Sequence, residues 1–393
     1  MGKLTALVCP MDWGLGHASR CVPVIRALKD AGFVVVAATS GPGAALIKSE
    51  FGISGSSNDW LRVIPFPGFS VTYTRSFLFL NLLLQVPLFL FHIQKEKKLI
   101  RSLAQRYKPD IIISDNRYGL AHGSVKSIII THQLRPSMPW YLKFAEGALA
   151  GVIRRWVRSF DECWIPDCPD DHASGKLTKG WEKLPGVYFI GWLSRFARLD
   201  LPGGLTKNSV RGDYRFRLMF ILSGPEPQRS ILEKMVIKQM SYTGIKTLLV
   251  RGLPFAPSVS EKRGELEIVP YLDSNALAHA ASISELIVCR SGYSSVMDML
   301  AMGKRAVLIP TPGQTEQEYL GRWLAKNGWF TVVKQKDLAR YGIAELLKDK
   351  EQSTAGPPGC LHADDAFRDL LKERITGLAR EKVAPGNSCQ GSE

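Results

Sequence analysis

Short apolar runs alternate with amphipathic stretches along most of the chain. Runs such as residues 4–9 and 111–113 have the near-continuous hydrophobicity of strands that are buried on both faces of a parallel sheet. Between them apolar residues recur at helical spacing, as do Val22, Ile25 and Leu28. The expected strands are residues 4–9, 33–38, 111–113, 127–130, 163–165 and 187–190 in the first half, and 216–222, 246–250, 267–269, 286–288, 306–309 and 329–333 in the second.

The alternation thins once, between residues 191 and 213, where Gly, Pro, Asp, Lys and Arg accumulate as in a linker. It then restarts and continues to about residue 350. Alternating strands and helices predict an α/β fold with parallel sheets. We therefore expect one doubly wound, Rossmann-like domain over 1–192, a linker over 193–213, a second such domain over 214–350, and a helix with a disordered tail over 351–393.

The stretch from residue 286 to residue 320 predicts strand, turn, helix, strand, turn and helix in succession. Two helix N-termini would then lie at the carboxyl edge of one sheet, where open α/β sheets bind ligands and where small residues suit phosphate. The candidate anion contacts are Ser291, Gly292, Ser294 and Ser295, and the candidate partners of sugar hydroxyls are Asp298, Gln317 and Glu318. An ordinary αβα unit whose serines only cap helices is the alternative interpretation.

A glycine loop, Gly14-Leu15-Gly16-His17, follows the first expected strand. It lacks the dinucleotide-binding fingerprint, because G-x-G-H replaces G-x-G-x-x-G and no acidic residue ends the second strand. His17 would stand at the carboxyl edge of the sheet and at a helix N-terminus, where the dipole favours the neutral imidazole that a general base requires. Capping the helix is the other role open to His17.

Two further expected strands are followed by polar side chains at the same edge of the sheet. Asp115 stands two residues after strand 111–113, and His132 stands two residues after strand 127–130. Because the carboxyl ends of parallel strands meet at one edge, we expect both side chains to face a cleft. There they would position other groups, or hydrogen-bond each other and nearby loops.

The most apolar part of the chain is residues 76–93, which include the run from Phe77 to Phe91. Its length is near that of a transmembrane helix, but polar residues and Pro87 interrupt it, and a spanning helix inside an α/β domain would separate the flanking strands. Two interpretations remain open. It is a core helix broken at Pro87, or a partly exposed helix that dips into a membrane surface beside the cations at 95–101.

Composition narrows the classes of function. The 393 residues contain 51 Lys and Arg against 36 Asp and Glu, a net charge of +15 that suits nucleic acid, an anionic membrane surface or phosphorylated ligands. No basic run with interleaved aromatic residues and no zinc-finger spacing is present, so nucleic acid ranks last. The seven cysteines are scattered without a C-x-x-C pair and no signal-peptide pattern precedes the first strand, which favours a reducing cytoplasm.

With the glycine loop at His17 and the sequence Cys289-Arg290-Ser291-Gly292, the chain resembles the GT-B glycosyltransferases. It is most similar to the MurG-like group of glycosyltransferase family 28, which transfer N-acetylglucosamine from a UDP-sugar in peptidoglycan synthesis. The resemblance covers residues 4–347 in organisation. It implies two Rossmann-like domains that face a central cleft, with the acceptor on the N-terminal side and the UDP-sugar on the C-terminal side.

Particular residues carry this resemblance. Residues 268–272 match the strand and turn beside uracil, Asp298 stands in place of a ribose-binding glutamate, and Glu318 departs from the second glutamine of a sugar-binding pair. Taken together with the spacing, the resemblance gives as donor residues Gly14, Gly16, Ser223, Gly224, Tyr271, Leu272, Arg290, Ser291, Gly292, Ser294, Ser295, Asp298, Gln317 and Glu318, with Asp115 and His132 on the acceptor side and His17 as the catalytic base.

The resemblance implies an inverting transfer to a hydroxyl acceptor, lipid- or envelope-linked, by a cytoplasmic enzyme peripheral to the inner face of the membrane. No D-x-D-like acidic pair follows a strand, so neither a metal nor any cofactor besides the UDP-sugar is expected. Two alternatives stay open. The stretch from Gly14 to Cys21 also resembles the G-x-G-H-x-x-R-C loop of PseG-like UDP-sugar hydrolases, and a non-catalytic nucleotide-sugar-binding protein would share the donor-site pattern.

Overall fold

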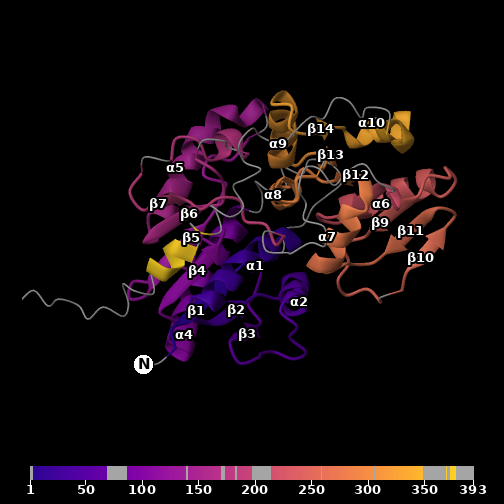
Figure 1. Cartoon of the computed structure of the whole chain (residues 1–393). Helices are drawn as coiled ribbons and strands as arrows, with labels where there is room; N and C mark the ends of the chain where they lie inside the picture. Colours follow the sequence, from indigo (N-terminus) through magenta and orange to yellow (C-terminus); the bar gives the residue numbers. More distant parts are fainter. Residues whose placement is uncertain are drawn as a thin grey trace, which may run out of the picture.

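Two seven-stranded sheets, one in each half of the chain, form the framework of the protein (Figure 1). The computed structural model describes residues 3–68, 86–138, 140–169, 173–181, 184–196, 214–257, 259–304, 306–347, 369 and 372–377. Each sheet belongs to a separate α/β domain in which helices connect the strands. The two Rossmann-like domains expected from the sequence are therefore confirmed.

In the first domain all neighbouring strands are parallel, in the order β3-β2-β1-β4-β5-β6-β7. These strands are β1 (Thr5–Cys9), β2 (Val34–Ala38), β3 (Leu61–Ile64), β4 (Ile111–Asp115), β5 (Lys126–Ile130), β6 (Glu162–Ile165) and β7 (Val187–Phe189). The helices are α1 (Leu15–Asp30), α2 (Gly41–Glu50), α4 (Val86–Tyr107) and α5 (Glu146–Val157), with 3₁₀ helices η1 (Trp140–Ala145) and η2 (Gly175–Leu177). The strand order reverses between β1 and β4, and α/β sheets bind ligands at such a switch point.

The second domain repeats this plan in the order β10-β11-β9-β8-β12-β13-β14, with only the β10–β11 pair antiparallel. Its strands are β8 (Phe216–Ile221), β9 (Thr247–Val250), β10 (Glu261–Arg263), β11 (Leu266–Val269), β12 (Ser284–Cys289), β13 (Ala306–Leu308) and β14 (Thr331–Val332). Its helices are α6 (Gln228–Met240), α7 (Ser274–Ser282), α8 (Tyr293–Ala301), α9 (Thr315–Lys326) and α10 (Gln335–Tyr341), followed by the 3₁₀ helix η3 (Ile343–Leu347). The switch point here lies between β8 and β12.

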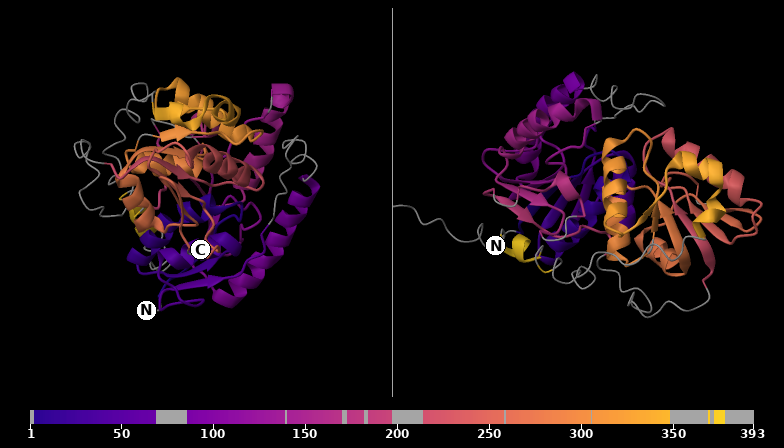
Figure 2. Two further views of the ribbon diagram at one scale, coloured as in Figure 1. Left: turned by 90° about the vertical axis from the view of Figure 1, so that its right-hand side faces the viewer. Right: turned by 90° about the horizontal axis from the view of Figure 1, so that it is seen from above.

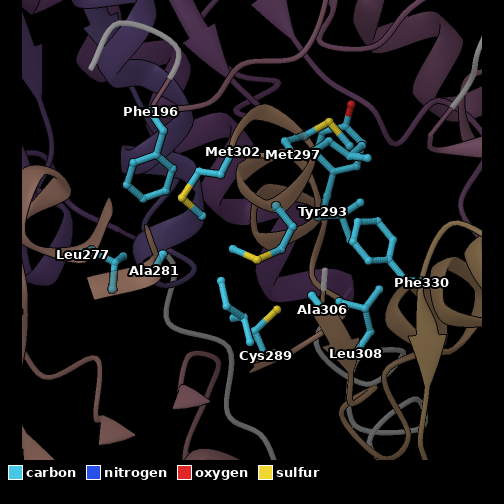
Figure 3. Packing of buried hydrophobic residues seen from close by; sticks show 14 of the residues in the cluster. Phe196, Leu277, Ala281, Cys289, Tyr293, Met297, Met302, Ala306, Leu308 and Phe330 are labelled. Carbon is cyan, nitrogen blue, oxygen red and sulfur yellow. The ribbon is translucent and has the colours of Figure 1, made fainter. Parts of the chain in front are cut away.

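Apolar packing joins the two domains. In the second domain, Leu308 of the sheet and Met297 of α8 belong to one buried cluster (Figure 3). The same cluster contains Phe196, from the stretch that precedes the linker, together with Leu177 and Trp192 of the first domain. The hydrophobic effect therefore favours the arrangement in which the carboxyl edges of the two sheets face each other.

The chain returns to the first domain near its end. Residues 372–377 are helical, Ile375 is buried in the core of the first domain, and Arg374 Nη2 lies 2.9 Å from Glu162 Oε1. The expected limits of the two domains and of the tail stay predictions. Most of the expected linker, residues 197–213, lies outside the described residues.

The run from Phe77 to Phe91 is described only from residue 86 onward. Its last residues open α4, where the side chains of Leu88, Leu90 and Phe91 are 49%, 44% and 64% exposed. The described part thus agrees with a partly exposed helix rather than a core helix. No helix within the described ranges has the length and apolar character needed to cross a membrane.

Candidate active site

A cavity of about 320 Å³ lies between the domains at the carboxyl edges of both sheets. It brings together most of the residues expected from the sequence: Gly14, Gly16, His17, His132, Ser223, Gly224, Tyr271, Leu272, Gly292, Ser294, Ser295, Asp298 and Gln317. It also contains residues that were not expected, namely Trp13, Arg20, Gln133, Arg195, Tyr293 and Glu316. Four of the expected site residues do not line it: Asp115, Arg290, Ser291 and Glu318.

The N-terminus of α1 aims His17 at this cavity. Gly14 precedes the helix with φ 85° and ψ −172°, a conformation that is essentially restricted to glycine. Residues 10–14 connect β1 to α1, and the turn at Gly14 starts the helix at Leu15, so His17 falls in its first turn. Its side chain is 14% exposed, enough to meet a ligand in the cavity.

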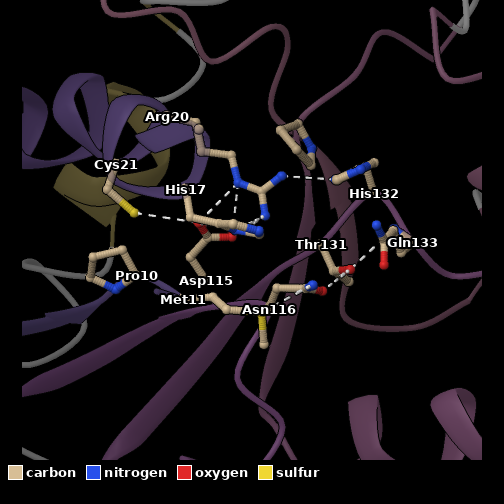
Figure 4. A network of polar contacts seen from close by, with 12 residues as sticks. Pro10, Met11, His17, Arg20, Cys21, Asp115, Asn116, Thr131, His132 and Gln133 are labelled. Carbon is tan, nitrogen blue, oxygen red and sulfur yellow. Dashed lines mark hydrogen bonds and ion pairs between the residues drawn. The ribbon is translucent and has the colours of Figure 1, made fainter. Parts of the chain in front are cut away.

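Asp115, at the end of β4, orients His17 from below (Figure 4). Asp115 Oδ2 lies 3.0 Å from His17 Nδ1, and Arg20 Nε lies 2.8 and 2.9 Å from the two oxygens of the same carboxylate. Burial alone would raise the pKa of Asp115, but the charge of Arg20, with help from His17, brings it down to about 2. The carboxylate therefore stays ionised. His17 Nδ1 lies 3.0 Å from this carboxylate and 2.9 Å from Arg20 Nη2, and we assign the proton to Nδ1 because the ionised carboxylate accepts from it, which leaves Nε2 as the basic nitrogen of His17.

His132 is held differently, because both of its ring nitrogens have partners. Arg20 Nη1 donates to His132 Nδ1 at 2.8 Å, and His132 Nε2 lies 3.0 Å from Glu316 Oε1 of α9. The other Glu316 oxygen accepts a close hydrogen bond from Gln133, and the His132 ring stacks on Tyr293 with centroids 3.9 Å apart. Burial lowers the pKa of His132, with Glu316 opposing the change. Neutral and fully bonded, His132 is placed to position Arg20 and Glu316.

The α8 N-terminus lies directly opposite α1. Ser294 Oγ donates to the carbonyl of Gly16 at 2.9 Å, and Ser291 Oγ donates to the carbonyl of Gln317 at 2.9 Å. These two hydroxyls, expected on sequence grounds to contact an anion, are thus used within the protein. Gly292 and Ser295 remain on the cavity wall, where helix N-terminal N–H groups suit a phosphate.

Asp298 and Arg195 form a buried charged pair beside this helix end. Asp298 Oδ1 accepts a 2.7 Å hydrogen bond from Ser194, and Arg195 Nε lies 3.9 Å from Asp298 Oδ2. Burial raises the pKa of Asp298 to about 6, although Arg195 opposes this rise. Within the described part of the chain, the buried Nε and Nη1 of Arg195 have no hydrogen-bond partner, and Nη1 lies 3.9 Å from Glu50 Oε1, so this guanidinium can still donate to an acceptor in the cavity.

The α9 N-terminus presents a different pair of side chains from the one expected. Gln317 lines the cavity, with its Oε1 accepting from the Thr311 N–H at 2.9 Å. Glu318 Oε1 instead accepts from the Gly313 N–H at 3.0 Å, and Glu316 occupies the wall. Successive helical residues point about 100° apart, so Glu316 and Glu318, on either side of Gln317, point about 200° apart and cannot both face the cavity.

Arg290 serves a structural purpose in the described chain. Its Nη2 donates to the carbonyl of Gln228 at 2.9 Å and its Nη1 to the carbonyl of Ile309 at 3.4 Å. Burial lowers the pKa of Arg290 to about 10. The side chain therefore connects the end of β12 to α6 and to the end of β13 behind the wall of the cavity that the second domain forms.

Comparison with known proteins agrees with this geometry. Residues 251–357 match the glycosyltransferase family 28 C-terminal domain. The UDP-N-acetylglucosamine–N-acetylmuramyl-(pentapeptide) pyrophosphoryl-undecaprenol N-acetylglucosamine transferase of Verminephrobacter eiseniae is 33% identical over 265 residues, 64% of this chain and 67% of that protein. The chain belongs to glycosyltransferase family 28. It is a glycosyltransferase.

More distant comparisons cover more of this family 28 chain. The equally named transferase of Acetivibrio thermocellus is 23% identical over 299 residues, 71% of this chain and 77% of that protein. The crystal structure of the glycosyltransferase SnogD from Streptomyces nogalater has a TM-score of 0.53 at 16% identity, and the alignment covers 97% of this chain and 99% of that chain. The second likeness shows the fold, which is that of the GT-B glycosyltransferases.

Proposed function

We propose that this family 28 enzyme transfers a sugar, N-acetylglucosamine in the first instance, from a UDP-sugar to an acceptor hydroxyl with inversion and without a metal. One observation carries the proposal: His17, paired with Asp115, faces a cavity whose opposite wall belongs to the family 28 domain. The curated relatives act on UDP-N-acetylglucosamine according to their names, which supports the choice of donor.

The chemistry begins with the acceptor hydroxyl in front of His17. As its oxygen attacks the anomeric carbon, the hydroxyl proton passes to His17 Nε2 and the bond from that carbon to the β-phosphate oxygen of UDP breaks. Asp115 stabilises the imidazolium that results, because its carboxylate stays ionised beside Nδ1–H. A base placed in this way contributes about two to four powers of ten in rate.

Negative charge grows on the departing UDP, and stabilisation there matters most. Three groups would supply it: the N–H groups at the start of α8, the glycine turn at Gly224, and the unpartnered N–H groups of Arg195. Asp298 would bind a ribose hydroxyl, and Gln317 a hydroxyl of the donor sugar. Glu316 takes the place on the wall that the sequence comparison had given to Glu318.

The acceptor we propose is lipid-linked and presented at a membrane surface. Leu88, Leu90 and Phe91 of α4 are exposed, and Phe144 of η1 is 83% exposed at the start of α5. Trp156 packs on Phe89 of α4 with ring centroids 6.0 Å apart, and α5 (Glu146–Val157) connects that contact to Phe144. Exposed cations on the same helices, at 95, 97, 98, 154 and 155, suit anionic headgroups.

The test combines a donor panel with one variant. UDP release is measured with UDP-, GDP-, TDP- and CMP-sugars, with and without detergent-dispersed lipid-linked saccharides, in the presence of EDTA. We expect UDP-N-acetylglucosamine to be consumed only with an acceptor, and His17→Ala to lower turnover by about 10²–10⁴-fold while UDP still binds. Consumption that is independent of acceptor would identify a hydrolase, and binding without turnover in any mixture would reject the enzymatic proposal.

A further inference from the structure

Arg117 is a buried cation that the transfer chemistry does not use. It lies two residues beyond β4 and is 2% exposed. Its guanidinium contacts three segments: Pro10 O at 2.9 Å and Asp12 Oδ2 at 2.7 Å in the β1–α1 loop, Pro67 O at 3.3 Å after β3, and Glu96 Oε1 at 2.9 Å on α4. Arg117 thus joins α4 to the loop that leads to His17.

The exit of β4 therefore holds the catalytic loop at both of its ends. Asp115 holds His17, just after the loop, and Arg117 holds Asp12, at its start. Asp12 also accepts a 3.0 Å hydrogen bond from Thr39 Oγ1 of the neighbouring β2 exit. The conformation between these two anchors, which includes the turn at Gly14, sets where His17 points.

Helix α4 reaches the same loop by a second route. The Trp13 ring lies 6.3 Å from the Phe89 ring, centroid to centroid, and Trp13 lines the cavity. Glu96 lies seven residues beyond Phe89, two helical turns along the same helix, and its second oxygen accepts from the Gly119 N–H at 3.2 Å. Leu88 and Phe91, on either side of Phe89, are exposed. The start of α4 therefore presents one face to solvent and packs its other face, through Phe89, against the loop that carries Trp13.

We propose that Arg117 is a positioning residue for sugar transfer, which through Asp12 and Glu96 fixes α4 and the β1–α1 loop as one unit and so aims His17 at the acceptor. This inference rests on the proposed function. Replacing a buried ion pair with apolar residues often leaves stability unchanged, so the Asp12–Arg117–Glu96 triad calls for a reason other than stability. Precise placement of a general base is such a reason, since a misplacement of about 1 Å costs about 10²-fold in rate.

The experiment compares two isosteric changes in the first domain. Glu96→Gln weakens the triad, and Glu162→Gln is its control, because Glu162 is likewise ion-paired, with Lys126 and Arg374, and is more deeply buried, but lies on β6. We expect Glu96→Gln to lower kcat by about 10–100-fold with UDP affinity within twofold of wild type, and Glu162→Gln to change neither. Arg117→Lys should lower kcat at least as far as Glu96→Gln.

A second measurement does not depend on catalysis. Hydrogen–deuterium exchange of the peptide that covers residues 10–16 should be faster in Glu96→Gln than in wild type and unchanged in Glu162→Gln. Unchanged exchange in Glu96→Gln, a parallel fall of UDP affinity and kcat, or an equal loss in the control would overturn the positioning role. If wild type transfers no sugar from any donor, the proposed function fails, and loop exchange alone then decides whether Arg117 fixes the loop.

Discussion

Asp298, which we propose binds the donor, lowers the stability of the free protein when it is ionised. Its carboxyl is buried, and this burial raises its pKa to about 6 from an ordinary value of 3.8. The folded protein therefore binds this proton more tightly than the unfolded chain does. Folding gains from the protonated group at low pH, and the gain is lost as pH rises from about 4 through 6.

Asp298→Asn should remove the destabilisation that the buried, ionised carboxylate causes at neutral pH. At pH 7.5 we expect the free energy of unfolding to rise by up to ~3 kcal/mol, the equivalent of the pKa rise, while at pH 4 variant and wild type should be nearly equal. The binding free energy of UDP should become less favourable by about 1–3 kcal/mol, because a charged acceptor for the ribose is lost. Denaturant unfolding at both pH values and calorimetric UDP titration measure these changes. Equal stability differences at pH 4 and pH 7.5 would refute the linkage.

Spacing in the sequence predicted the sheet edge at which the cavity lies, but not the pairing of side chains there. His17 and Asp115 were each placed at the carboxyl edge of the first sheet, yet they stand 98 residues apart, and no periodic pattern indicates that they touch. Arg20 was overlooked as the link between Asp115 and His132, because an arginine in a helix is usually solvated. Arg195 was overlooked because it stands where the pattern indicates a linker.

At the scale of elements, hydrophobic runs were informative wherever strands are buried on both sides. The central strands of both sheets coincide with the expected runs to within one or two residues. β10 was not expected, since Glu261, Lys262 and Arg263 are all exposed and show no apolar pattern. α2 was also not expected, because it begins with Gly41-Pro42-Gly43, which usually indicates a turn, although proline is well tolerated in the first turn of a helix.

The contact between α1 and α8 gives a prediction at this scale. A Cβ at Gly16 would lie 3.0 Å from Ser294 Oγ and 3.4 Å from Ser294 Cβ. Gly16→Ala should therefore push the two helix ends apart and lower kcat by roughly tenfold or more. Removing the obstructing hydroxyl should restore part of that loss, so the double variant Gly16→Ala/Ser294→Ala should be faster than Gly16→Ala.

Steady-state kinetics of the four proteins in this cycle, including Ser294→Ala alone, give the coupling between the two positions. Ser294→Ala by itself loses one hydrogen bond, worth about 0.5–1.5 kcal/mol, and should be only mildly impaired. Strictly additive effects would mean that the helix ends are not in contact during turnover.

At the scale of the whole molecule, polar contacts close the two domains around the cavity. Glu316 bonds to His132 and Gln133 on one side, and Lys176 N donates to Tyr319 Oη at 2.6 Å nearby. On the other side Glu50, at the end of α2, accepts from the Ser274 N–H at 3.1 Å. Polar contacts between the two domains, which lie side by side in Figure 2, join residues up to 278 positions apart, as Gly16 and Ser294 are, and no sequence pattern predicts them.

The Glu50 contact caps a helix of one domain with a carboxylate of the other. Glu50 stands at the N-terminus of α7, where a negative charge is favoured, and its other oxygen lies 3.2 Å from Arg26 Nη2. Arg26 Nη1 in turn donates to the carbonyl of Arg195 at 2.7 Å. Glu50 therefore favours the closed form and holds the stretch that carries Arg195.

Glu50→Gln should weaken this cap by about 1–2 kcal/mol, since a charge-assisted hydrogen bond becomes a neutral one. The closed form would then be less populated, and the apparent Kd for UDP-N-acetylglucosamine should rise by roughly tenfold. Small-angle X-ray scattering should give a larger radius of gyration for the free variant than for the free wild type, with the two values converging at saturating donor. Ser274→Ala leaves the Glu50 carboxylate and its hydrogen bond from the backbone N–H of residue 274 in place. It should therefore change the radius of gyration and the apparent Kd in the same direction, but by less. A free Glu50→Gln protein as compact as the wild type, with unaltered donor affinity, would mean that the other contacts between the domains, apolar and polar, are enough to hold them together.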